Sequence, residues 1–218
     1  MYLSTDFPEA ASSNVQPLCR HYLAVLVQPL TLRVKHQTAT FSLRACWGTG
    51  VFSDGQLEVL GIWSATGSDS TISNVANADL ACRGVESVRV FVIPQYLRPW
   101  QTLPGSKLVD PDPLSAPEKE PGLSADRRVA RLREPRASAL TPRQWAMVVQ
   151  GEAGSDSLHA RLLQAVLRQG CFESSASARS FALLTLLAFD GKRRSRDAAG
   201  SARGTRWLSP VKRTACDA

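Results

Sequence analysis

The sequence predicts an α/β protein in which three strands, a helix and a fourth strand precede a proline-rich linker and a helical C-terminal segment. Three observations lead to this fold class. Short apolar runs alternate with turn signals over the first hundred residues, eight of the thirteen prolines fall within 99–142, and leucines then recur at helical spacing. A hairpin followed by a helical crossover implies a mixed sheet with a right-handed connection.

The first three strands are expected to form the N-terminal part of this sheet. The run 21–28 is apolar and of strand length, and 41–47 alternates apolar and polar residues with the period of two of a half-buried strand. Asp54-Gly55 then predicts a hairpin, because the central residues of a tight hairpin turn must accept positive φ and Asp-Gly does so readily. The run 57–63 is the returning strand.

A helix and a fourth strand are expected to follow the hairpin. Ser68 or Asp69 can cap the helix, and Gly84 stands where a left-handed residue would end it. The run 88–93 is short, apolar and β-branched, which suits a strand buried on both faces, and Pro94 stops it.

The composition divides the rest of the chain from this sheet. Residues 1–98 are expected to hold the sheet, and 99–142 form a linker too rich in proline for a lasting helix or a central strand. Residues 143–191 are expected to be a helical hairpin with an apolar seam. Its first helix is capped at Asp156 and its second ends at Gly191.

The remaining residues, 192–218, are predicted to be a basic tail without regular structure. Eight basic residues face two acidic ones from Lys192 onward, so six of the seven net positive charges lie there. A basic tail attracts nucleic acid by releasing its counterions. Two interpretations stay open, namely DNA contact or a solvated tail that keeps the protein soluble. The candidate nucleic-acid-binding residues are Lys192, Arg193, Arg194, Arg196, Arg203 and Arg206.

Metal and membrane binding have no local support in the sequence. The five cysteines lie far apart without zinc-knuckle spacing, and the three histidines do not cluster with acids or cysteines. No apolar run approaches the roughly 20 residues of a membrane span, and the N-terminus lacks a secretory signal. We therefore expect no metal site, no membrane contact and a cytoplasmic location.

Two blocks of sequence resemble Mutator-type bacterial insertion-sequence transposases. The first, 50–63, reads Gly-Val-Phe-Ser-Asp-Gly-Gln-Leu-Glu-Val-Leu-Gly-Ile-Trp, close to the family's strand-turn-strand pattern G-x-x-x-D-G-x-x-E-V-L-G-x-W. The second, 79–92, begins Asp-Leu-Ala-Cys-Arg-Gly-Val and is similar to the family's D-L-x-x-R-G-V-x-x-V-R. A weaker match at 158–174 is similar to the helical C-termini of some members.

The resemblance implies a partial ribonuclease-H-like core and a role in DNA transposition, with transposon-end DNA as partner. In that family three acids hold two divalent metals, Mg²⁺ in intact members, which drive phosphoryl transfer. Aligned on Arg33-Val34, the position of the first acid is Gln28, and Gln95 stands nearest the second. No third acid is assigned, because the proline-rich stretch stands where most of a long helical insertion should be.

These replacements put the family's chemistry in doubt. Glutamine offers one neutral carbonyl oxygen, so it can neither offset the charge of two metals nor act as a base. No Asp or Glu occurs between Glu9 and Asp54, so a shifted alignment does not restore the first acid. We expect a truncated, transposase-like protein with little or no catalysis, no catalytic residues and no cofactor. The alternatives are a DNA-binding regulatory module that pairs with an intact transposase, a decayed gene product without function, and an unrelated α/β protein.

Overall fold

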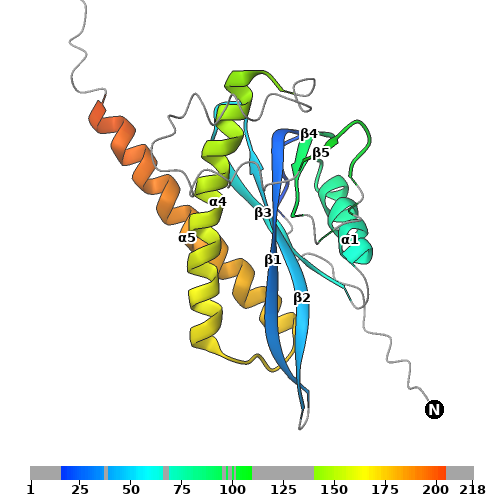
Figure 1. Cartoon of the computed structure of the whole chain (residues 1–218). Coiled ribbons are helices and arrows are strands. Elements are labelled where there is room, and N and C mark those ends of the chain that lie inside the picture. Colours follow the sequence, from blue (N-terminus) through cyan, green and yellow to red (C-terminus); the bar gives the residue numbers. More distant parts are fainter. Residues whose placement is uncertain are drawn as a thin grey trace, which may run out of the picture.

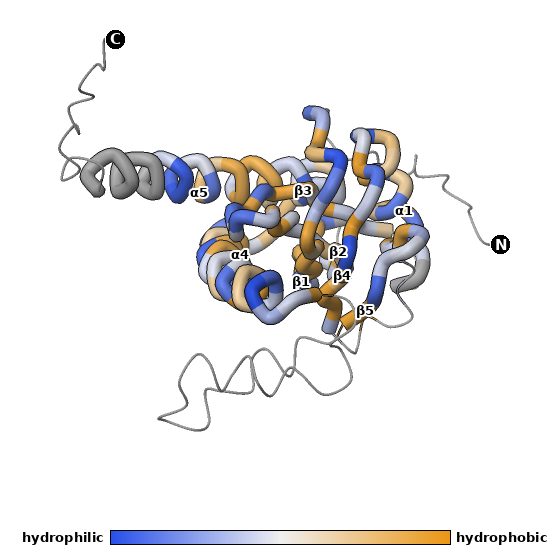
Figure 2. Tube along the Cα trace, turned by 90° about the horizontal axis from the view of Figure 1, so that it is seen from above, coloured by the Kyte–Doolittle hydropathy of each residue, from blue (hydrophilic) through white to orange (hydrophobic). Residues whose placement is uncertain are grey.

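A five-stranded mixed sheet lies between one helix on one face and two long helices on the other (Figure 1). This computed structural model describes residues 16–36, 39–65, 69–94, 97, 100, 102–109 and 140–204. Figure 2 looks at the same arrangement from above, with α1 on one side of the strands and α4 and α5 on the other. The predicted α/β class is confirmed.

The strands lie in the order β3-β2-β1-β4-β5. In chain order they are β1 (His21–His36), β2 (Ala39–Val51), β3 (Leu57–Ser64), β4 (Ser87–Val92) and β5 (Lys107–Val109). Antiparallel pairing joins β1 to β2 and β2 to β3, whereas β4 is parallel to β1, and β5 to β4. The sheet is therefore mixed, as the order of strands and helix predicts.

Two strand predictions need correction. β1 was expected to end at Gln28 but continues to His36. The pairing of β1 with β4 reaches only Leu26, so among the described strands one side of β1 is unpaired at Pro29. Proline is accepted in a strand at such a position, because it lacks the N–H that a neighbouring strand would need. β5 was not predicted at all, because its three residues fall within the expected linker 99–142.

The turns and the first helix follow the sequence closely. Gly55 takes a φ of 83° in the β2–β3 hairpin. In this turn the side chain of Asp54 accepts a hydrogen bond from the backbone N–H of Gln56. Helix α1 (Asp69–Cys82) follows β3, and Gly84 beyond it has a φ of 94°. The predicted hairpin, helix and left-handed glycine are confirmed.

The C-terminal helices are longer than predicted. Helix α4 (Pro142–Gln169) is capped by Thr141, whose side chain accepts a hydrogen bond from the Gln144 backbone N–H in a capping box. Asp156 is therefore not its cap. Helix α5 (Ser175–Gly204) passes through Gly191, which the sequence interpretation took as its end. Residues 192–204 thus belong to a helix and not to an irregular tail.

Apolar side chains fill both sides of the sheet. On the α1 side, Ile72, Ala76 and Leu80 pack on the strands. On the other side, α4 and α5 share their clusters with the first three strands, so they are not a separate hairpin. The members from β1 and β2 in the larger of these clusters are Leu30, Leu32, Val34, Leu43, Ala45 and Trp47.

Candidate functional site: a polar seam between the sheet and α4

The two sequence blocks that carry the resemblance contact each other. Trp63 Nε1 on β3 donates to Asp79 Oδ2 on α1 at 2.9 Å, and Arg83 lies 3.3 Å from the same oxygen. Arg83 also donates to the backbone carbonyl of Leu60 and, at 3.0 Å, to that of Gln16. Because these side chains are largely buried, the motif residues fix α1 to β3 and serve the scaffold.

Glu58, the second of the two acids in the first block, also serves the scaffold. The Tyr22 hydroxyl on β1 donates to Glu58 Oε2 on β3 at 2.5 Å. Burial, followed by this hydrogen bond, raises the pKa of Tyr22 well above its usual range. The β2–β3 hairpin is thereby tied to β1 across β2.

A row of hydrogen bonds joins the opposite face of the sheet to α4. We name its six residues the polar seam. Its three bonds run from Gln28 Nε2 to Asp156 Oδ1 (2.8 Å), from Trp47 Nε1 to His159 Nδ1 (3.0 Å), and from Thr49 Oγ1 to Ser155 Oγ (3.0 Å). His159 follows Asp156 by three residues and Ser155 by four, so the helical members lie along one side of α4.

Glycine allows α4 to approach the strands closely. A Cβ atom on Gly151 would lie 2.8 Å from Val51 Cγ2, and one on Gly154 would lie 2.6 Å from Leu57 Cδ1. Both distances are shorter than side chains accept. The small residues therefore set the helix-to-sheet distance at which the short side chain of Ser155 reaches Thr49.

Two ionisable groups of α4, Glu152 and His159, have pKa values shifted in favour of their neutral forms. Burial, and then the nearby charge of Asp156, raises the pKa of Glu152 to about 8. Burial lowers the pKa of His159. Its Nδ1 accepts a hydrogen bond from Trp47 Nε1–H, so the neutral ring carries its own proton on Nε2. At neutral pH a protonated Glu152 and a neutral His159 therefore flank Asp156.

The structure brings one mapped family position into this seam. Gln28, the position aligned with the first acid, is bonded to Asp156. Leu26 pairs with Val92 in the parallel β1–β4 ladder, so the same register extended by two residues sets Gln28 level with Pro94. Gln95, which stands nearest the second acid, lies outside the described residues.

Sequence reasoning missed Asp156 as a partner of the sheet. It interpreted Asp156 as the cap of a helix, whereas Asp156 lies inside α4. The spacing of Glu152 and Asp156, one helical turn apart, was the available signal. Nothing in the sequence linked either acid to Gln28, because that contact spans 128 residues.

A metal ligand set does not form in the described residues. No group of three or more His, Cys, Asp or Glu side chains comes together there. In the seam, Asp156 accepts a hydrogen bond from the Gln28 amide.

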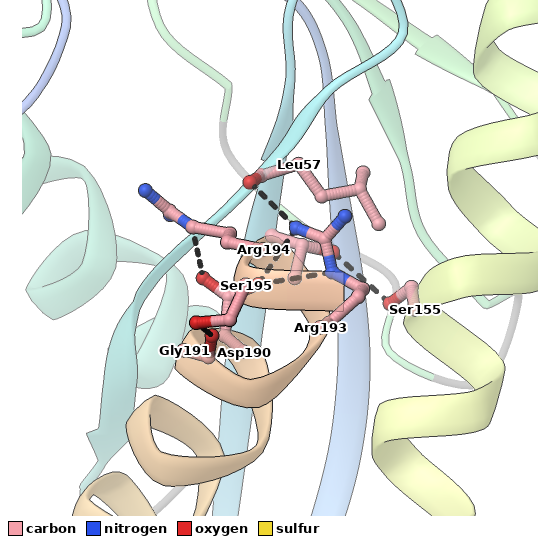
Figure 3. A network of polar contacts seen from close by, with 8 residues as sticks. Leu57, Ser155, Asp190, Gly191, Arg193, Arg194 and Ser195 are labelled. Carbon is pink, nitrogen blue, oxygen red and sulfur yellow. Dashed lines mark hydrogen bonds and ion pairs between the residues drawn. The ribbon is translucent and has the colours of Figure 1, made fainter. Parts of the chain in front are cut away.

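One of the predicted nucleic-acid-binding residues, Arg193, holds α5 to the sheet, and a second, Arg194, forms an ion pair within α5. Asp190 is 3% exposed, and its carboxylate pairs with Arg193 at 2.7 Å and with Arg194 at 2.8 Å (Figure 3). Arg193 Nη2 also donates to the Leu57 carbonyl of β3 at 3.0 Å. These arginines therefore have a structural role, in which two cations offset one buried carboxylate.

The other residues of that prediction are less defined. Lys192 is exposed on α5. Arg196 and Arg203 lie within α5, but their side chains fall outside the described part of the chain, as does all of Arg206. DNA contact by this segment stays a prediction.

No protein-family model matches this chain, and no curated protein matches it. None of the helices in the described residues combines the length and hydrophobicity needed to cross a membrane. The fold and the seam define a mixed α/β protein with helices on both faces of its sheet. Transposase ancestry stays a prediction from the two sequence blocks.

Proposed function

We propose that this chain is a transposase-derived, DNA-binding protein with a ribonuclease-H-like sheet and without the metal chemistry of an intact transposase. The observation that carries the proposal is the position of Gln28. This residue, aligned with the family's first acid, lies on the middle strand of the sheet and bonds to Asp156 of a helix that follows the proline-rich segment.

The geometry around Gln28 supports this assignment. Three acids that share two metals must converge from separate parts of the chain. Here Gln28 of β1 contacts Asp156 of α4, and β4 runs parallel to β1 as far as Val92, which lies opposite Leu26. Asp156, or Glu152 one turn earlier, is the descendant of the third acid, which the sequence alone did not assign.

The same geometry supports a loss of catalysis. The Gln28 amide donates to Asp156, so a hydrogen bond fills the space in which two carboxylates would share a metal. Mg²⁺ prefers anionic oxygen ligands. Gln28 supplies a neutral amide where the family's first acid supplies a carboxylate.

DNA binding and nicking by the full chain test the proposal. Fluorescence anisotropy with a labelled duplex, in EDTA or in Mg²⁺, should give the same affinity at equal ionic strength. Affinity should fall steeply with added salt, because phosphate contacts release counterions. Supercoiled plasmid should stay intact in Mg²⁺ or Mn²⁺. Nicking that requires the metal would refute the loss of catalysis, and an absence of duplex binding would refute the DNA-binding function.

A further inference from the structure

β1 and β2 extend beyond α1 as a two-stranded ribbon (Figure 1). One face of this ribbon is covered, because Leu30, Leu32 and Val34 are buried in the cluster with α4 and α5. Strand residues alternate between faces, so their neighbours point the other way. On this opposite face, three residues of β1 and three of β2 are exposed. We name these six residues the basic ribbon face: Thr31, Arg33, Lys35, Thr40, Ser42 and Arg44.

The basic ribbon face has a regular chemical pattern. Its residues form three cross-strand pairs, Thr31–Arg44, Arg33–Ser42 and Lys35–Thr40. Each pair combines one cation with one hydroxyl group. No acidic residue occurs between Glu9 and Asp54, so the two strands carry no negative charge.

We propose that the basic ribbon face binds the phosphate backbone of duplex DNA. Arg, Lys, Ser and Thr side chains are the usual donors to phosphate oxygens. Pairs on one face follow each other at roughly 6.8 Å along a strand, about twice the 3.4 Å axial spacing of phosphates on one DNA strand. Three cations along the ribbon can therefore follow one strand of the duplex.

The fold decides how the ribbon can approach DNA. Because α4 and α5 cover its other face, only the basic ribbon face is open to a phosphate backbone. The basic ribbon face differs in its ion pairing from Arg193 and Arg194 of α5, which both form ion pairs with Asp190. Among the described residues, no ion pair engages Arg33 or Lys35.

The inference rests on the proposed DNA-binding function, and it assigns the surface that performs it. The test compares the full chain with the triple variant Arg33→Gln, Lys35→Gln, Arg44→Gln, by anisotropy with a labelled duplex over a range of KCl. Each lost phosphate contact lowers the slope of log affinity against log salt by about 1. The triple variant should therefore lose about 3 from the slope, and roughly tenfold or more in affinity.

A matched control removes the same number of charges elsewhere. Arg89, Arg143 and Arg168 are exposed, and their replacement by Gln should leave the slope as in the wild type. The variant Arg33→Lys, Arg44→Lys keeps the cations and should also keep the slope. Thermal melts of all variants identify any loss of affinity that follows from unfolding.

The outcomes separate this inference from the proposed function. Wild-type binding with equal slopes in the ribbon and control variants would overturn the ribbon face and leave the DNA-binding function standing. No binding by the wild type would overturn both. A duplex RNA that competes as well as duplex DNA would overturn duplex DNA as the specific ligand of the basic ribbon face.

Discussion

Gln28 is the residue whose replacement tests the ancestry of the seam most directly. Gln28→Glu keeps the shape of the side chain and sets a second carboxylate beside Asp156, where the amide is now 2.8 Å away. Two carboxylates at this distance repel each other, and this repulsion raises the pKa of one of them. In EDTA we expect the melting temperature to fall by roughly 2–4 °C, which corresponds to about 1 kcal/mol. Added Mn²⁺ should restore it.

The control for this prediction is the double variant Gln28→Glu, Asp156→Asn, which has one carboxylate at the seam. Its melting temperature, and that of the wild type, should not depend on Mn²⁺. Differential scanning fluorimetry measures all three proteins. A Gln28→Glu protein that is insensitive to Mn²⁺ would argue against a former metal site.

Glu152 gives a second prediction at the residue scale. Its pKa rises from 4.5 to about 8 on folding, so the folded protein binds a proton that the unfolded chain has released between these values. The contribution of Glu152 to the free energy of unfolding is fully present below pH 4.5 and is lost as the pH rises through 8. Glu152→Gln removes this loss, so the variant should be more stable than the wild type at pH 8, and the difference should shrink toward pH 5.

Urea denaturation at several pH values measures that difference. His159 must be considered with it, because burial lowers its pKa. Its contribution has the opposite sign, being present above the usual pKa of about 6.5 and lost as the pH falls below it. Glu152→Gln leaves this acid-side loss in place, so an equal gain in stability at pH 5 and pH 8 would contradict the assigned pKa shift.

Packing at the scale of elements predicts opposite effects for two helical glycines. Alanine is intrinsically better than glycine inside a helix by about 0.8–1 kcal/mol. In α5, a Cβ on Gly191 meets nothing within 4 Å, so Gly191→Ala should stabilise the protein by about that amount. In α4, a Cβ on Gly151 lies 2.8 Å from Val51, so Gly151→Ala should destabilise it by about 1–3 kcal/mol.

Thermal or urea unfolding of the two alanine variants checks this pair. Gly191→Ala serves as the matched control, since it makes the same chemical change in a helix without the contact. If both variants gained stability, the close approach of α4 to β2 would be wrong, and with it the distance that lets Ser155 reach Thr49.

Local patterns predicted the elements whose signals are local. The Asp54-Gly55 turn, the strand β3 and the end of α1 at Gly84 depend on nearby residues, and the structure has them where they were expected. The failures arose where tertiary packing decides. Gly191 did not end α5, because a glycine without positive φ can continue a helix whose neighbours are buried against the sheet.

The candidate site was less predictable than the fold, for the same physical reason. Gln28 was identified through the resemblance, but its partner Asp156 is distant in the sequence, and the contact depends on the packing of α4. The cations of the basic ribbon face went unrecognised, since β1 was expected to end at Gln28, before Arg33 and Lys35. The alternation of side chains along a strand shows which residues share an exposed face only once the ends of the strand and its covered face are known.

At the scale of the whole molecule, the sheet and the C-terminal helices depend on one another. The sequence interpretation divided the chain into a half-core at 1–98 and a helical hairpin at 143–191, whereas the buried cluster includes strands and both long helices. At 1.5–3 kcal/mol for each buried side chain, uncovering Leu30, Leu32 and Val34 costs about 4.5–9 kcal/mol. This is comparable to the whole stability of a typical domain, about 5–15 kcal/mol.

A chain that ends at residue 139 should therefore lack a cooperative thermal transition, because it keeps the strands and loses α4 and α5. A chain that ends at residue 204 keeps every member of the three buried clusters and should melt as the full chain does. Far-UV circular dichroism during heating distinguishes the two. A cooperative melt of the shorter chain would mean that the strands with α1 form an independent unit. The covered face of the β1–β2 ribbon would then be free in that unit, and the helices would be an addition to an already stable sheet.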